Sequence, residues 1–392
     1  MILGFLLKND VDRFQKFYIF AFCKYQQMSK KYQVIGLMSG SSLDGLDVAH
    51  CEINVKSDPF EVESWSLTAA ETIAFSTEWQ RRLAELPQQS AFIFCQTHAA
   101  FGHYLGAITA NFIQKNALKP DFIASHGHTI FHCPEKKFTT QIGDGAAIAV
   151  ETNCKVVCDF RTHDIALGGE GTPLAPTADR YLFAGYDFYL NIGGIANLTC
   201  RCGNGKYVAF DVGAANQVFN ALSQTLGFLY DDEGKIAAQG KPIPMLFEEL
   251  NDLDYFSKKY PKSLDNNWLR ENITQKYLDF EAIAADKLRT AYEQLAFQIA
   301  QSVRQIEKIE NFDKKNYSLL VTGGGAFNIF LIKIIEKFCP NIEIIIPEKN
   351  IIQFKEAALM ALLGVMRVEQ FTNCMHSVTG ASRDSIGGAI YL

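Results

Sequence analysis

The sequence lacks a surplus of positive charge, because 37 Lys and Arg residues stand against 43 Asp and Glu residues and give a net charge of −6 at pH 7. Nucleic-acid backbones and anionic membranes attract basic surfaces, so neither is an expected partner. The sequence also lacks an apolar run of the roughly 18 residues that a membrane span needs. Residues 1–7 are apolar, but they have neither the basic segment nor the cleavage site of a secretory signal. We therefore expect a cytoplasmic protein.

Two nucleotide-binding motifs and a zinc motif are missing as well. No G-x-x-x-x-G-K-[ST] occurs, and residues 322–326 do not fit the dinucleotide fingerprint. Cys200 and Cys202 form a C-x-C, but no second cysteine pair lies at zinc-finger spacing, so free thiols are expected. With 48% hydrophobic and 20% charged residues, the composition is that of an ordinary globular protein. The 392 residues suggest two or three domains.

The pattern of apolar residues predicts an α/β protein in which one feature occurs twice. Apolar strands at 33–38 and 48–55 flank a Gly/Ser loop at 39–45, and strands at 188–192 and 196–202 flank a turn at Gly193 and Gly194. Further strands are predicted at 122–125, 155–159, 207–213 and 318–321, and helices at 77–117 with a break at Pro87, at 214–226, at 286–310, from 328 and at 355–368. The repeated hairpin predicts two similar α/β domains that face each other across a cleft.

The expected domain boundaries follow from these elements. Residues 1–31 are predicted to be an extension outside the fold, with Met28 as the true start or residues 1–27 loosely attached. Residues 32–165 form the first domain, residues 166–370 form the second, and residues 371–392 return to the first. The Gly- and Pro-rich stretch at 165–176 is a ligand loop or a crossover between domains.

The loop after the first strand has the composition of a phosphate-binding turn. Glycine and small hydroxyl residues let successive backbone N–H groups converge on an anion, and an acidic residue among them fits a divalent cation that accompanies phosphates. An ordinary hairpin turn is the alternative, and it would be preferred if the second glycine hairpin were absent. The residues concerned are Gly40, Ser41, Ser42, Leu43, Asp44, Gly45, Leu46 and Asp47, with Asp44 as the metal ligand.

Two such hairpins and a third glycine turn near the C-terminus resemble the actin, Hsp70 and sugar-kinase superfamily. Within it, the sequence resembles the anhydro-N-acetylmuramic acid kinases. The matching runs follow in the same order at 35–45, 125–130, 141–144, 159–161, 168–174, 190–194, 323–328 and 377–381. The resemblance implies a two-domain actin-like ATPase fold of the ribonuclease H-like type, with ATP and the sugar in the interdomain cleft.

The resemblance also implies an activity and a set of site residues. The family opens the 1,6-anhydro bridge of 1,6-anhydro-N-acetylmuramic acid with water and moves the γ-phosphate of ATP, with Mg²⁺, to the sugar O6. The product is N-acetylmuramate 6-phosphate, in peptidoglycan recycling. By resemblance, Asp211 is the base for the water, and Thr129, Arg161 and Glu356 surround the sugar. The first loop would bind the nucleotide together with Asn191, Gly193, Gly194, Gly323, Gly324, Gly325 and Asn328.

Several of these residues have a plainer alternative. Asp211 lies at the carboxyl end of a strand, where α/β folds bind ligands, but it could instead cap the following helix. Glu356 could be a residue of a first helical turn that the helix dipole favours. Arg161 suits a bidentate contact with the lactyl carboxylate of a muramic acid, or a structural salt bridge with Asp159 or Asp164.

The sequence departs from the family's pattern around the sugar rather than in the phosphate loops. Residues 211–216 lack the Pro and second Gly of D-x-G-P-G-N, residues 162–163 replace an Arg-rich run, and Glu170 stands where Gln is common.

Two histidines and the overall function leave further alternatives. His128 and His132 have the metal-ligand spacing of a helix, but Gly127 and Pro134 predict that no helix forms there. The alternative functions are a kinase of another amino or hydroxyl sugar, in which Asp211 deprotonates the acceptor hydroxyl, and a non-catalytic ATP switch. A homodimer is left open.

Overall fold

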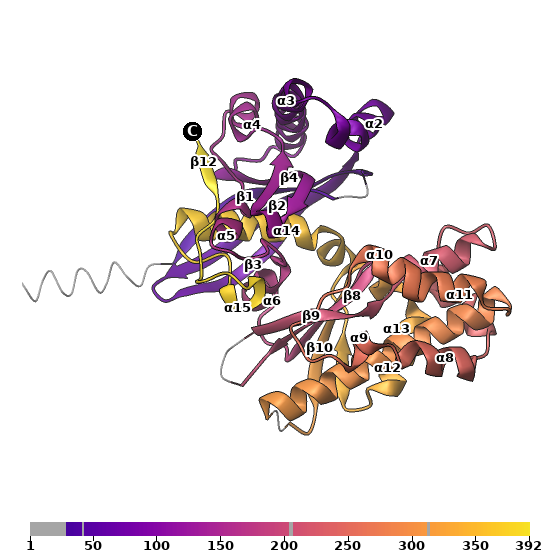
Figure 1. Cartoon of the computed structure of the whole chain (residues 1–392). Coiled ribbons are helices and arrows are strands. Elements are labelled where there is room, and N and C mark those ends of the chain that lie inside the picture. Colours follow the sequence, from indigo (N-terminus) through magenta and orange to yellow (C-terminus); the bar gives the residue numbers. More distant parts are fainter. Residues whose placement is uncertain (1–28, 41–42, 204–206, 312–313) are drawn as a thin grey trace, which may run out of the picture. The chain divides into compact units, whose positions relative to one another are not determined.

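The computed structural model describes residues 29–392 except 41–42, 204–206 and 312–313. The chain divides into two compact units (Figure 1). Unit 1 contains the described residues up to Leu182 together with Glu356–Leu392, and unit 2 contains Phe183–Lys355.

Unit 1 is built on a mixed sheet in the order β12-β6-β4-β1-β2-β3, with β5 added to β4. Its strands are β1 (Lys30–Ser39), β2 (Gly45–Ser57), β3 (Phe60–Ala74), β4 (Phe122–Cys133), β5 (Phe138–Ile142), β6 (Val156–Cys158) and β12 (Ala389–Tyr391). Its helices are α2 (Thr77–Glu85), α3 (Ala91–Lys115), α4 (Gly145–Thr152), α5 (Thr162–Ala166), α6 (Ala175–Tyr181), α15 (His376–Thr379) and most of α14 (Lys349–Val368). Helices α2, α3 and α4 lie on one side of the sheet and α14 lies on the other (Figure 1).

Close packing of α14 on this sheet depends on glycine. A Cβ added to Gly36 of β1 would lie 1.8 Å from the carbonyl oxygen of Ala357, and one added to Gly364 of α14 would lie 2.8 Å from the Cβ of Ala124 in β4. Only residues without a side chain allow backbones to approach so closely. The opposite face is filled by a buried cluster that includes Ile35 and Phe101.

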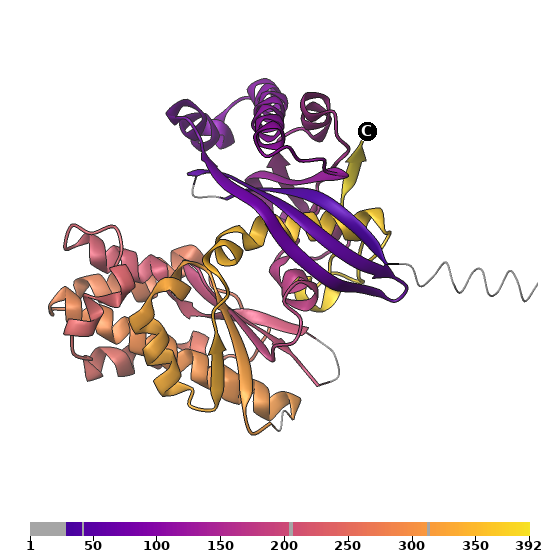
Figure 2. The same cartoon turned by 180° about the vertical axis from the view of Figure 1, so that it is seen from behind.

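Unit 2 repeats the central part of this plan. Its sheet has the order β11-β10-β7-β8-β9, with strands β7 (Phe188–Ile192), β8 (Ile195–Arg201), β9 (Tyr207–Ala214), β10 (Tyr317–Thr322) and β11 (Ile342–Ile345). Its helices are α7 (Asn216–Gln224), α8 (Pro244–Asn251), α9 (Asp254–Ser257), α10 (Asn266–Leu269), α11 (Gln275–Asp279), α12 (Ala284–Glu310) and α13 (Ile329–Phe338). The layers of each unit are seen from behind in Figure 2.

The two sheets share one strand order and one pattern of directions. In unit 1, β1, β2 and β3 are antiparallel neighbours, and β4 and β6 run parallel to β1. In unit 2, β7, β8 and β9 are antiparallel neighbours, and β10 and β11 run parallel to β7. The repeated hairpin read from the sequence is therefore the start of a repeated sheet. The predicted fold class, a two-domain actin-like α/β fold, is confirmed, and the interdomain cleft stays a prediction.

The predicted boundaries differ from the division into units. Helix α6 and the part of α14 from Glu356 to Val368 belong to unit 1, whereas the sequence placed both in the second domain. Contacts explain the difference, because Tyr181 of α6 packs its ring against Phe60 and Phe371, and α14 packs on β1. Residues 371–392 lie in unit 1. The predicted extension 1–31 ends inside β1, which begins at Lys30, and the hypothesis about Met28 lies outside the described residues.

Most predicted elements are present, but strands β5, β11 and β12 and helices α4, α5, α6 and α15 were not predicted. The break at Pro87 is seen as a 3-10 turn (Leu86–Gln88) between α2 and α3. The helix predicted at 355–368 begins at Lys349, strand β3 was not predicted, and the short helices between 244 and 279 were missed. None of the described helices combines the length and the apolar character that crossing a membrane requires.

Candidate active site

The glycine turn between β7 and β8 supports the start of helix α7. The backbone N–H of Asn216 donates to the carbonyl of Gly193 (3.1 Å), and that of Ala215 donates to the carbonyl of Gly194 (3.0 Å). The Asn216 side chain donates to the carbonyl of Ile192 (3.2 Å). The turn and the N-terminus of α7 are therefore one fixed piece of backbone.

The glycine turn after β10 packs closely against the end of β7, next to the turn between β7 and β8. Gly323 has φ +82°, and a Cβ there would lie 2.7 Å from the carbonyl oxygen of Ile192 and 2.8 Å from Oδ1 of Asn191. A Cβ on Gly325 would lie 2.2 Å from Cγ2 of Ile192. The structure thus brings together Asn191, Gly193, Gly194, Gly323, Gly324 and Gly325, which the sequence assigned to the nucleotide.

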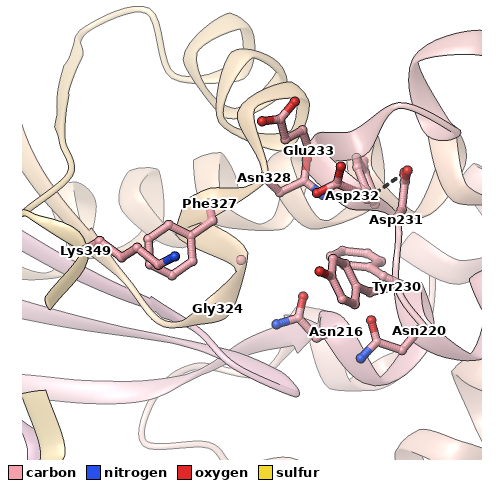
Figure 3. A pocket seen from close by; sticks show the side chains of 13 residues that line it. Asn216, Asn220, Tyr230, Asp231, Asp232, Glu233, Gly324, Phe327, Asn328 and Lys349 are labelled. Carbon is pink, nitrogen blue, oxygen red and sulfur yellow. Dashed lines mark hydrogen bonds between the residues drawn. The ribbon is translucent and has the colours of Figure 1, made fainter. Parts of the chain in front are cut away.

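A cavity of about 560 Å³ in unit 2 opens beside these turns. Its lining includes Asn216, Asn220, Tyr230, Gly324, Phe327 and Lys349 (Figure 3). The rings of Tyr230 and Phe327 are largely exposed, at 60% and 41%, and Figure 3 shows them on opposite sides of Gly324. Exposed aromatic rings beside backbone turns can hold a nucleobase and its phosphates, because rings stack on bases and N–H groups bind anions.

A buried chain of side chains stiffens one wall of this cavity. The amide of Asn328 donates to the hydroxyl of Tyr292 (2.7 Å), and that hydroxyl donates to Oδ2 of Asp231 (3.0 Å). Asp231 also accepts from the N–H groups of Ile236 (2.7 Å) and Ala237 (3.0 Å). The oxygen of Asn328 accepts from the N–H of Leu331 and caps α13. The Asn328 side chain is therefore held mainly by the protein, and its predicted contact with the nucleotide stays a prediction.

Sequence reasoning missed Asp231 and Tyr292. Tyr292 lies at a buried position of the long helix predicted at 286–310, where the periodicity of apolar residues does not reveal that its hydroxyl is buried. The available signal was the hydroxyl itself, because a buried tyrosine nearly always needs a polar partner.

Asp211 lies inside β9 rather than at the start of a helix. The N-cap position of α7 is Ala215, so the helix-cap alternative is wrong. Oδ2 of Asp211 accepts from the N–H of Leu264 (2.8 Å), and the backbone oxygen of Asp211 accepts from the hydroxyl of Tyr255 (2.8 Å). Burial raises the pKa of Asp211, and the Leu264 N–H partly offsets the effect. A carboxylate with a raised pKa and an oxygen to spare can accept a proton.

The first predicted phosphate loop lies between β1 and β2 in unit 1. Gly40, Leu43 and Asp44 occupy the turn, with Leu43 at φ +60°, and Ser41 and Ser42 lie outside the described residues. Gly45, Leu46 and Asp47 are the first residues of β2. The Leu46 side chain is in the core at 1% exposure, so only its backbone is available to a ligand.

The acidic residues of this predicted loop are Asp44 and Asp47. Oδ1 of Asp47 accepts from the hydroxyl of Thr72, its neighbour on β3 (2.5 Å). Burial, with the nearby Asp44 carboxylate, raises the pKa of Asp47. Among the described residues no three His, Cys, Asp or Glu side chains gather as metal ligands. Magnesium ions beside phosphates commonly use only one or two carboxylates, and the assignment of Asp44 as a metal ligand stays a prediction.

The other sugar-site residues lie in unit 1. The hydroxyl of Thr129 in β4 accepts from the side chain of Gln141 (3.3 Å). Glu356 is an exposed residue of α14, about two turns after the helix begins, so the first-turn alternative is wrong. Burial lowers the pKa of Arg161, and the Glu356 carboxylate partly offsets this lowering. Arg161 and Glu356 therefore share one electrostatic environment.

Arg161 forms neither of the salt bridges weighed from the sequence. Its Nε donates to Nε2 of His126 (2.8 Å), and its Nη1 donates to the carbonyl of Gly171 (3.1 Å). Asp159 instead accepts from the backbone N–H of Thr162 (3.3 Å). Asp164 accepts from the N–H of Gly171 and the hydroxyl of Thr379, both at 2.8 Å.

The two histidines with metal spacing have separate partners. Both lie in strand β4. Nδ1 of His128 lies 2.9 Å from the hydroxyl of Ser39, and Nδ1 of His132 lies 3.2 Å from that of Thr139. The prediction that they do not lie on a helix is confirmed.

Comparisons with known proteins agree with these motifs. A family model described as anhydro-N-acetylmuramic acid kinase matches residues 32–392. Proteins of that name from Sulfurovum sp. and Coxiella burnetii are 34% and 35% identical to this chain, over 92% of its length and 99% and 98% of theirs. One from Shewanella sediminis is 32% identical over 91% of this chain. Among solved structures, a glucose-bound hexokinase from Schistosoma mansoni covers 86% of each chain at 10% identity, with a TM-score of 0.40. On the sequence matches, the chain belongs to the anhydro-N-acetylmuramic acid kinase family.

Proposed function

We propose that the chain opens the 1,6-anhydro bridge of 1,6-anhydro-N-acetylmuramic acid with water and transfers the γ-phosphate of ATP to O6 of the sugar. The product is N-acetylmuramate 6-phosphate, and the role is peptidoglycan recycling. Family membership supports the reaction. The single structural observation that carries it is the Asp211 carboxylate, which is partly buried, accepts one hydrogen bond from a backbone N–H and has a raised pKa.

Asp211 can supply the general base that the reaction needs. Its Oδ2 is held by Leu264, which leaves Oδ1 for a water molecule. As the water oxygen bonds to C1 of the sugar, Asp211 takes one proton. The bond from C1 to O6 breaks, O6 bonds to the γ-phosphorus, and ADP departs. Burial makes the carboxylate a stronger base than an exposed aspartate, because it disfavours the charged form.

The nucleotide fits the glycine turns and cavity of unit 2. Added Cβ atoms at Gly323 and Gly325 would collide with the β7 backbone and Ile192, so the turn is shaped by the lack of side chains. The cavity beside it has the polar and aromatic lining of a nucleoside site. Mg²⁺ would neutralise charge on the transferring phosphates, with Asp44 as its protein ligand.

An ADP-release assay tests the proposal directly. ADP should form with 1,6-anhydro-N-acetylmuramic acid and form far more slowly with N-acetylmuramic acid or glucose. In ¹⁸O-labelled water, the label should enter the product at C1. ADP formation without label at C1 would favour a kinase of an ordinary hydroxyl sugar, and no sugar-dependent ADP would favour an ATP switch.

Two further properties belong to this proposal. Use of ATP and the reduced state expected of the cysteines favour the cytoplasm, and cell fractionation tests it. The homodimer left open by the sequence stays a prediction, which light scattering on the purified chain tests.

A further inference from the structure

The guanidinium of Arg161 is only partly used by the protein. It carries five N–H donors, of which Nε–H binds His126 and one Nη1–H binds Gly171. The remaining donors lie on both terminal nitrogens. A carboxylate can therefore bind to the remaining hydrogens of Nη1 and Nη2, whereas Nε–H is occupied.

The structure fixes the protonation state of His126. Arginine Nε can only donate, so Nε2 of His126 must be the unprotonated nitrogen that accepts. Nδ1 then carries the proton and lies 3.0 Å from the carbonyl of Gly127. Burial, with the positive charge of Arg161, lowers the pKa of His126 to about 3. The ring is a neutral acceptor throughout the physiological range.

Gly171 holds the guanidinium from a second direction. Its carbonyl accepts from Nη1 of Arg161, and its N–H donates to Asp164. Asp164 is completely buried and also accepts from Thr379. Gly171 has φ +67°, a conformation that favours glycine. These hydrogen bonds hold the Gly- and Pro-rich stretch at 165–176 against Arg161. The sequence predicted this stretch to be a ligand loop or a crossover between domains.

A neutral partner has an electrostatic consequence. An aspartate or glutamate in place of His126 would orient Arg161 equally well but would cancel its charge. The two hydrogen-bond partners of the guanidinium, His126 and a backbone carbonyl, are neutral, so the only opposing charge that acts on it from the described residues is the more remote Glu356 carboxylate, to which it has no hydrogen bond, and its remaining donors can bind a further anion. A hydrogen bond between two opposite charges is about twice as strong as one between neutral groups.

We propose that His126 is a positioning residue that, with Gly171, aims Arg161 as the receptor for the carboxylate of the sugar's lactyl group. This inference rests on the proposed function for the identity of the sugar. If the proposal holds, Arg161 determines the preference of the enzyme for anhydro sugars that carry a carboxylate over those that do not.

The test compares two anhydro sugars that differ only in the lactyl group, 1,6-anhydro-N-acetylmuramic acid and 1,6-anhydro-N-acetylglucosamine. In the full chain, His126→Leu should lower kcat/KM for the first sugar by about tenfold or more, mainly through KM, since a hydrogen bond to a charged group is lost. For the second sugar, kcat/KM should change by less than about twofold. His126→Gln should recover much of the loss, because its Oε1 can take the place of Nε2. Arg161→Lys should mimic His126→Leu.

Controls separate positioning from folding. His50→Leu removes another buried histidine, on β2, and should leave the preference between the two sugars unchanged. Equal losses for both sugars in His126→Leu, or an unchanged preference in both His126→Leu and Arg161→Lys, would overturn the inference.

Binding of the two sugars in the absence of nucleotide, measured by calorimetry, distinguishes a failure of the inference about His126 and Arg161 from a failure of the proposed function. Wild-type chain that binds both sugars equally would refute the carboxylate receptor. Wild-type chain that releases no ADP, yet binds the carboxylated sugar better in a way that His126→Leu abolishes, would refute the kinase alone.

Discussion

At the residue scale, the partly buried carboxylate of Asp211 is unfavourable for folding, and we propose that it serves as the catalytic base. Asp211→Asn keeps an oxygen for the N–H of Leu264 but removes the base, so we expect kcat to fall by at least about 10² with little change in KM for ATP. The exposed Asp252→Asn is the matched control. Steady-state kinetics on both variants checks the prediction, and a near-normal kcat in Asp211→Asn would remove this residue from the mechanism.

The same substitution should stabilise the fold. A carboxylate whose pKa is raised by burial contributes stability below its unfolded pKa and loses it as the pH rises through its folded pKa. At neutral pH the buried charge is therefore unfavourable, and Asp211→Asn should raise Tm by about 2–4 °C, the shift produced by ~1 kcal/mol in a unit of this size. The gain should vanish below about pH 4. Thermal melts at both pH values check it.

The pH profile of the wild-type chain follows from the same group. Asp211 must be deprotonated to act as a base, so kcat/KM should fall as the pH is lowered through its raised pKa. We expect the acidic limb to lie above about pH 4, the ordinary aspartate value. The lactyl carboxylate of the sugar has a lower pKa than the buried Asp211, so its ionisation should affect kcat/KM at a lower pH than that of Asp211. An acidic limb at or below the ordinary value would contradict the assigned environment.

A motif around a residue predicts a role for that residue but not its partners. Asp211 and Arg161 were assigned to the site because their neighbours match a family, and these roles stay predictions, whereas their hydrogen-bond partners could not be predicted. Leu264 and His126 are 53 and 35 positions away along the chain. No local spacing rule connects residues at such separations, so only the folded chain shows that Arg161 has a neutral partner.

At the element scale, the Asp231–Tyr292–Asn328 chain joins a loop, α12 and α13. Tyr292→Phe would leave a buried carboxylate short of one donor and the Asn328 amide without its acceptor, at a cost of about 1–3 kcal/mol. We expect a lower Tm and a higher KM for ATP. Tyr277→Phe removes another buried tyrosine hydroxyl of unit 2, which donates to Gln294, and should leave KM for ATP unchanged. Equal effects of both variants on KM would contradict a link to the cavity.

The glycine turn after β10 provides a steric prediction. Gly325→Ala would place a methyl group 2.2 Å from Cγ2 of Ile192, whereas the nearest atom to a methyl group on Gly324 is 3.6 Å away. Gly325→Ala should therefore lower Tm by several degrees and weaken ADP binding, because the turn must move. Gly324→Ala should keep its Tm. Melting curves with and without ADP check both.

Element-scale prediction failed in recognisable ways. Helix α14 begins at Lys349, six residues before the predicted start at 355. Residues 349–354 contain no glycine or proline, so nothing in them prevents the helix from extending in this direction. Strand β3 is an edge strand with much of its length exposed, so its weak alternation of apolar residues was overlooked. The helices between 244 and 279 are short, and one or two turns are too few for a helical period to be visible.

At the scale of the whole molecule, the start of the fold can be tested. The family match begins at residue 32, and β1 begins at Lys30. We therefore expect a chain that begins at Met28 to match the full chain within about twofold in kcat and KM and to have the same Tm. A loss of activity in the shorter chain would show that residues 1–27 contribute to the enzyme.

The two sheets have the same strand order, but they differ in where they place an acidic side chain. At the third pair of the matching hairpins, unit 1 has Asp47 on the inner strand opposite Thr72, and unit 2 has Asp211 on the edge strand opposite Asn197. The acidic residue therefore lies on the inner strand of one hairpin and on the edge strand of the other. Among the described residues, only in unit 1 does its carboxylate accept a hydrogen bond from a hydroxyl, that of Thr72. Two sheets with the same strand order therefore need not support the same chemistry, because the acidic side chain has a hydroxyl partner in one and a backbone N–H partner in the other.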